Sequence, residues 1–120
     1  MRRQLALLAA AVLAASTVSA TGHYEPKKLA GTYSIGTASL TDPAPGESSD
    51  ALLRLYLTGD AAKDLFKALR AKPERDECFD DGTMTKVSGE LLCARHPSGS
   101  HECWIGVNIE SPSLAPAFVC

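Results

Sequence analysis

The chain has 120 residues and carries 12 Lys and Arg against 14 Asp and Glu, which gives a formal net charge of −2. A chain of this length is expected to form one compact domain. Its cations are scattered among carboxylates. This argues against nucleic acid as a partner, because phosphate binding needs clustered Lys and Arg.

Residues 1–20 are predicted to be a secretory signal peptide. Arg2 and Arg3 precede an apolar run, and the segment ends on the small residues VSA, which are typical of a cleavage site. No later segment reaches the roughly 20 apolar residues that a membrane-spanning helix requires. The first cysteine, Cys78, lies too far from the cleavage point to carry a lipid anchor. We therefore expect a periplasmic or secreted protein with no membrane anchor.

The first half of the remaining chain is predicted to contain a flexible arm, two strands and a loop. Residues 21–31 are polar and show no apolar period, so they predict the flexible N-terminal arm. Residues 32–40 alternate weakly and predict a first strand, while residues 41–49 hold two prolines and a glycine and predict an exposed loop. Residues 51–58 predict the clearest strand, with its leucines on one face.

A helix is predicted over residues 60–71, because apolar residues recur there at helical spacing and the side chains before it can cap it. An acidic connector follows at residues 74–82, and the segment after residue 110 is interrupted by prolines. Three further strands are predicted from period-two patterns: residues 83–88, 90–95 and 102–110. The order predicts a single α+β domain over residues 32–120, with a small antiparallel sheet of about five strands and one helix packed on a face.

Four cysteines, Cys78, Cys93, Cys103 and Cys120, are expected to form two structural disulfides in an oxidising compartment. Spacing alone leaves three pairings open. Cys93 and Cys103 could face each other across a predicted hairpin, which would pair Cys78 with Cys120. We prefer the alternative, Cys78 with Cys93 and Cys103 with Cys120, because it joins the connector to a strand and tethers the end of the chain.

A rival interpretation of the same region is a metal site. Cys93, His96, His101 and Cys103 surround one tight turn and have the ligand types of zinc, but their spacing matches no common zinc finger. Nothing in the chain has the pattern of a nucleophile elbow, a phosphate loop or a metalloprotease helix. A pairing of Ser98 or Ser100 with His101 is disfavoured because residues of one turn rarely reach catalytic geometry. We therefore predict no catalytic residues, no metal and no cofactor.

Two groups of residues are candidates for binding a partner. Trp104, Tyr56 and Arg54 would form an aromatic and cationic patch if their sheet face is uncovered, whereas Trp104 would belong to the core if the helix covers it. Asp80 and Asp81 in the acidic connector could contact a basic partner.

Three segments, LTGDAAKDLFKAL, KVSGELLC and ECWIGVNI, carry a resemblance to a group of known proteins. This layout, over about residues 52–110, resembles small periplasmic proteobacterial proteins with a signal peptide, some of which are similar to immunity proteins that neutralise secreted antibacterial toxins. The resemblance implies a disulfide around the cysteine-bearing strands and a toxin or effector as the partner.

The sequence thus predicts a non-enzymatic, exported protein-binding domain, such as an immunity or inhibitor protein. The alternative is a secreted module that binds a metal or a small ligand.

Overall fold

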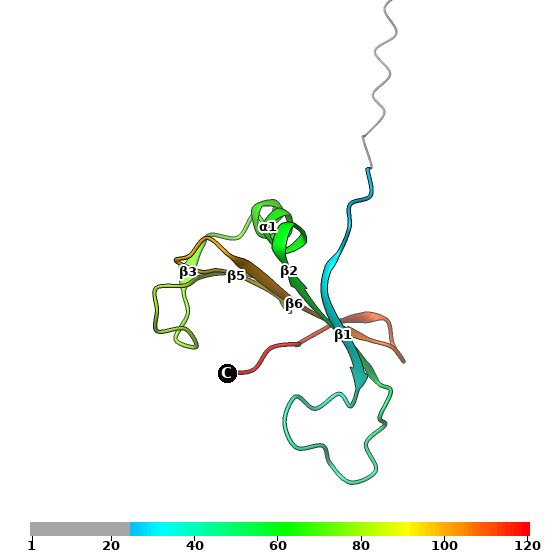
Figure 1. The fold of residues 1–120 in the computed structure, drawn as a ribbon. Coiled ribbons are helices and arrows are strands. Elements are labelled where there is room, and N and C mark those ends of the chain that lie inside the picture. Colours follow the sequence, from blue (N-terminus) through cyan, green and yellow to red (C-terminus); the bar gives the residue numbers. More distant parts are fainter. Residues whose placement is uncertain (1–24) are drawn as a thin grey trace, which may run out of the picture.

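The computed structural model describes residues 25–120, so the predicted signal peptide and the first four residues of the predicted arm lie outside the described residues (Figure 1). The described chain is an antiparallel sheet crossed on one face by one helix, α1 (Gly59–Ala68). The strands are β1 (Ala30–Gly36), β2 (Leu52–Thr58), β3 (Glu74–Arg75), β4 (Met84–Ser88), β5 (Leu91–Arg95), β6 (His101–Asn108) and β7 (Ser113–Ala115). Strand β1 includes Ala30 and Gly31, which are the last two residues of the predicted arm.

The centre of the sheet is β6. The strand order is β1-β2-β6-β5-β4-β3, and β7 also pairs with β6. On one side, β6 pairs with β2 along its length. On the other side, β5 pairs with its first half and β7 with its last three residues, so β5 and β7 share one flank of β6. All pairs are antiparallel, and the short connections from β4 to β5 and from β5 to β6 allow no other arrangement of those strands.

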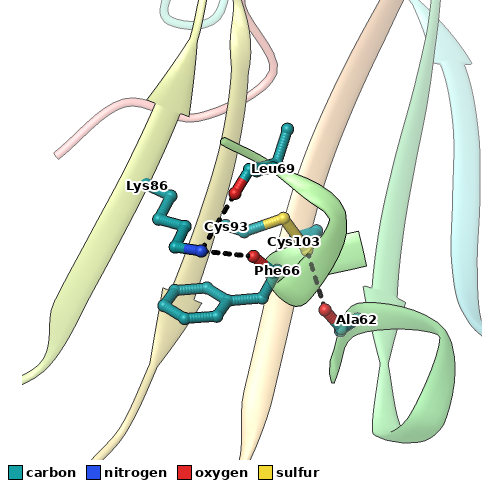
Figure 2. Close-up of a disulfide and its surroundings, with 6 residues drawn as sticks. All are labelled: Ala62, Phe66, Leu69, Lys86, Cys93 and Cys103. Atoms are coloured by element: carbon teal, nitrogen blue, oxygen red, sulfur yellow. Dashed lines mark hydrogen bonds between the residues drawn. A yellow bond between two sulfur atoms is a disulfide. The ribbon is translucent and has the colours of Figure 1, made fainter. Parts of the chain in front are cut away.

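Helix α1 begins directly after β2 and folds back over the sheet. Its buried residues Ala62 and Phe66 pack against Leu57. They also pack against the Cys93–Cys103 disulfide (Figure 2). The cap differs from the prediction, because Thr58 is the N-cap residue but its side chain makes no capping hydrogen bond.

The helix ends at Ala68, three residues before the predicted end. Lys86 reaches over from β4, and its Nζ donates to the carbonyl oxygens of Phe66 at 2.9 Å and Leu69 at 3.0 Å (Figure 2). These carbonyls at the end of a helix have no partner within it, so a cation satisfies them and stabilises the terminus there. Lys86 also lies 4.7 Å from the centroid of the Phe66 ring.

The opposite face of the sheet is covered by two segments that we call the strap, residues 76–83 and 116–120. The Cys78–Cys120 disulfide joins the two segments. Phe79 of the first segment stacks on Phe118 of the second, with ring centroids 5.8 Å apart and planes 10° apart. In Figure 1 the C-terminal segment runs on the side of the sheet away from α1.

The predicted fold class was wrong. The chain is mostly β, with seven strands in place of about five and one ten-residue helix. The additional strands are β3, within the acidic connector, and β7, between Pro112 and Pro116 in the C-terminal segment. They have two and three residues, which is too short to show an alternating pattern.

The preferred disulfide pairing was also wrong, and Cys93–Cys103 with Cys78–Cys120 is the observed arrangement. The turn after β5 closes with bonds from His96 N to Ser100 O and from Gly99 N to His96 O, both 2.9 Å. This turn sets the register in which Cys93 lies directly opposite Cys103, with Cα atoms 4.1 Å apart. Such closely spaced antiparallel neighbours can be joined without moving the backbone.

Candidate functional site

Two of the predicted binding residues lie side by side on the strap face. Tyr56 and Trp104 are direct cross-strand partners in β2 and β6, with ring centroids 5.6 Å apart. The helix lies on the other face, but Trp104 is not open either, because the Phe118 ring of the strap lies 4.6 Å from it. Trp104 is half-buried, so neither the fully uncovered nor the helix-covered alternative describes it.

Arg54 lies two residues from Tyr56 on the same face, but its guanidinium is engaged. Nη2 donates to the carbonyl oxygen of Thr37 at 2.7 Å and to that of Ser39 at 3.0 Å. Glu47 completes this corner by accepting bonds from the backbone N and the hydroxyl of Ser39. Arg54 therefore holds the loop between β1 and β2 against the sheet, and Glu47 joins two parts of the loop to each other.

A chain of hydrogen bonds links this aromatic pair to the strap. The Tyr56 hydroxyl donates to Glu102 Oε2 at 2.5 Å, and Glu102 Oε1 lies 2.8 Å from His96 Nε2. His96 Nδ1 lies 2.8 Å from the hydroxyl of Thr83, which donates to Asp81 Oδ1 at 2.5 Å. The chain runs from β2 through β6 to the first strap segment and fixes the strap on the sheet.

This network changes the acid–base behaviour of both ends. The hydrogen bond to Glu102, with burial, raises the pKa of Tyr56 to about 12. At the other end, bonds from the hydroxyl and backbone N of Thr83 lower the pKa of Asp81. Asp81 therefore bonds within the strap, and both Asp80 and Asp81 are exposed.

The strap leaves a shallow hollow on each side of Trp104. One, of about 190 Å³, is lined by Arg54, Tyr56 and Ala117 among others, and the second, of about 120 Å³, lies toward Val87. Pockets that enclose small organic ligands typically have volumes of about 300–1,000 Å³. Both hollows fall short of that range.

The zinc site that was considered as a rival interpretation does not form. The sulfurs of Cys93 and Cys103 are bonded to each other, and the two histidines lie on opposite faces, His96 against Phe79 and His101 against Phe66. Burial lowers the pKa of His101. Between residues 25 and 120, no group of three or more His, Cys, Asp or Glu side chains could hold a metal ion.

A surface that the sequence analysis did not single out lies on the helix face, beyond the helix. Four apolar side chains are direct neighbours across four strands, and we call them the apolar row: Ile35, Leu53, Val107 and Leu114. Ile35 is 55% exposed and Leu114 53%, and Tyr33, in the adjacent row, is 73% exposed. The sequence contained a signal for this surface. Strands β2 and β6 place more apolar residues on the helix face than a helix of ten residues covers.

Comparisons with protein-family models, curated proteins and solved structures gave no match. The resemblance to periplasmic immunity proteins therefore stays a prediction from sequence motifs. In the part of the chain that the structure describes, no helix has the length and apolar character needed to cross a membrane.

Proposed function

We propose that this chain is a non-enzymatic, exported protein-binding domain that neutralises a secreted protein, as immunity or inhibitor proteins do. The apolar row carries this proposal. It presents contiguous apolar side chains of four paired strands on a rigid sheet, and exposed apolar patches of this kind mark protein interaction sites.

Export is supported by the cysteines. All four are paired in the structure, and within residues 25–120 none is free. Two disulfides in a small domain are compatible with an oxidising extracellular compartment, where such bonds persist. The predicted periplasmic or secreted location is part of this proposal.

The shape and charge of the surface favour a protein over a small molecule. The row lies across a sheet face, and the two hollows on the opposite face are smaller than typical ligand pockets. The chain carries more Asp and Glu than Lys and Arg, so a partner with a basic rim around an apolar centre would be steered to it. A basic exported toxin or effector has this chemistry.

The test is binding of exported effector proteins that are encoded beside this gene, measured by calorimetry with the oxidised protein. Leu114→Lys places a charge on the apolar row, and we expect it to weaken binding at least tenfold, about 1.4 kcal/mol. Val87→Lys is the matched control, because Val87 is 51% exposed but belongs to the strap face. Equal affinity of the two variants, or no binding by any such effector, would contradict the proposal.

A further inference from the structure

The free edges of the sheet are not alike. Strand β3 has two residues and both are charged, and β7 has three residues between two prolines. Short length, charge and proline are the features that protect edge strands from pairing with other chains. Strand β1 has none of them, because its seven residues, AGTYSIG, contain neither charge nor proline, and all but the last are exposed.

We propose that β1 pairs antiparallel with β1 of a second copy about a twofold axis, so that the chain is a homodimer with one continuous sheet. An edge strand offers unpaired backbone N–H and C=O groups, and an antiparallel neighbour satisfies them. This inference goes beyond the proposed function and does not depend on the identity of its partner.

The side chains of β1 are self-complementary in the register centred on Tyr33. There, Tyr33 faces Tyr33 of the second copy, and aromatic cross-strand pairs stabilise sheets. Ile35 faces Gly31 of the second copy, a residue whose close approach to the Tyr56 backbone of its own chain excludes any side chain. On the other face Thr32 meets Ser34 of the second copy, a pair that forms hydrogen bonds across strands.

The charged residues on either side of β1 also favour antiparallel pairing of the two β1 strands. The chain before β1 carries Lys27 and Lys28, and the loop after β1 carries Asp42, Glu47 and Asp50. Antiparallel pairing brings the basic segment of each copy beside the acidic loop of the other, whereas parallel pairing would place Lys28 beside Lys28. Lys27 is also bonded to Asp64, at 2.9 Å, which leaves the exposed Lys28 nearest the second copy.

The dimer would also cover apolar surface. Tyr33, 73% exposed, and Ile35, 55% exposed, lie at the twofold axis and next to it. Leu53, Val107 and Leu114 lie on inner strands and stay available to the protein partner. One edge therefore serves self-association, and the adjoining face serves recognition.

The first experiment measures the mass of the oxidised protein in solution by sedimentation equilibrium over a wide concentration range. We expect twice the mass of one chain, and Ile35→Lys should reduce it to a single chain. Leu114→Lys is the control, since it changes an equally exposed residue of the same face on β7, and it should leave the dimer intact. The two proposals can thus fail separately, because Leu114→Lys weakens only partner binding.

A second experiment tests the register. Tyr33→Cys should form a disulfide between two copies on a non-reducing gel, because directly opposite residues have Cβ atoms about 5 Å apart. Thr32→Cys should not, because residue 32 lies opposite residue 34. A protein that stays monomeric throughout, a dimer that Ile35→Lys leaves unchanged, or equal crosslinking of both cysteine variants would overturn the proposal.

Discussion

The two faces of the sheet are covered in different ways. On one face, α1 follows β2 without a linker and inserts Ala62 and Phe66 above a buried disulfide. On the other face, the strap has no helix or strand of its own over Trp104, and it is held by the Cys78–Cys120 disulfide, stacked rings and a hydrogen-bond chain. The helix face depends on apolar packing, whereas the strap face depends on a crosslink and on polar contacts.

This contrast indicates which part of the molecule can unfold locally while the rest stays folded. Segments with few buried apolar contacts open at a lower free energy than the core does. The strap meets this description, because its apolar contacts come from Phe79 and Phe118, which are only half-buried, and its one fully buried side chain, Thr83, is polar. The helix does not, since Phe66 is 3% exposed.

The largest difference is expected between the two disulfides. Replacing both Cys93 and Cys103 with alanine should lower the free energy of unfolding by about 5 kcal/mol, because a loop constraint and fully buried sulfur are lost together. Cys78 and Cys120 close the longer loop, whose constraint on the unfolded chain is worth roughly 4 kcal/mol. Replacing them should nevertheless cost only about 2 kcal/mol, because the strap can then detach and regain freedom while the sheet stays folded. Denaturant unfolding followed by circular dichroism and by Trp104 fluorescence measures both. A larger loss of unfolding free energy on replacing Cys78 and Cys120 than on replacing Cys93 and Cys103 would contradict this prediction.

The next effect compares two phenylalanines. Phe66→Ala empties a buried site under the helix and should cost about 4 kcal/mol. Phe118→Ala removes a half-buried ring from the strap and should cost about 2 kcal/mol. Only Phe118→Ala should shift the Trp104 emission of the native protein to longer wavelength. Similar losses in thermal unfolding would mean that the two faces are equally packed.

A smaller effect is expected in alkali, on the strap face. It is larger than the effect of His101, because the pKa of Tyr56 is the more strongly shifted of the two. The pKa of Tyr56 is raised to about 12, above its ordinary value of 10.0, because its hydroxyl bonds to Glu102. Stability from this bond is present below pH 10.0 and is lost as the pH rises toward about 12. Absorbance titration should follow the ionisation, and Tyr56→Phe should abolish this part of the alkaline loss. Tyr33→Phe, on the other face, should leave it in place.

The smallest effect is expected in acid, on the helix face. Burial lowers the pKa of His101 below its ordinary value of 6.5, so the folded state favours the neutral ring. The corresponding stability is present above pH 6.5 and is lost as the pH falls through the lowered pKa. Unfolding measured at several pH values should show this loss, and His101→Gln should remove it. A loss of the same size in the variant would assign it to other groups.

Strong repeating patterns made several elements predictable. The alternating leucines of β2 and the apolar stripe of α1 led to elements within a few residues of the observed ones. The end of the helix was missed because it depends on Lys86, which comes from a strand far along the chain. Strands β3 and β7 were missed because they pair through the backbone over two or three residues, without a side-chain pattern.

The candidate site was predictable only in part. Tyr56 and Trp104 are neighbours because of the register in which β2 pairs with β6. That register cannot be derived from the sequence pattern of either strand. Arg54 was taken as a binding residue, but carbonyl groups of the adjoining loop engage its guanidinium. The apolar row was missed because it becomes visible only when one counts how many apolar positions a short helix leaves uncovered.

The two disulfides are nested, since the Cys93–Cys103 bond lies wholly within the span that Cys78–Cys120 closes. The inner cysteines are ten residues apart and the outer ones 42, so the inner pair meets more often in an unfolded chain. Oxidative folding can therefore proceed from the hairpin outward, with thiol exchange converting a scrambled pairing into the native one.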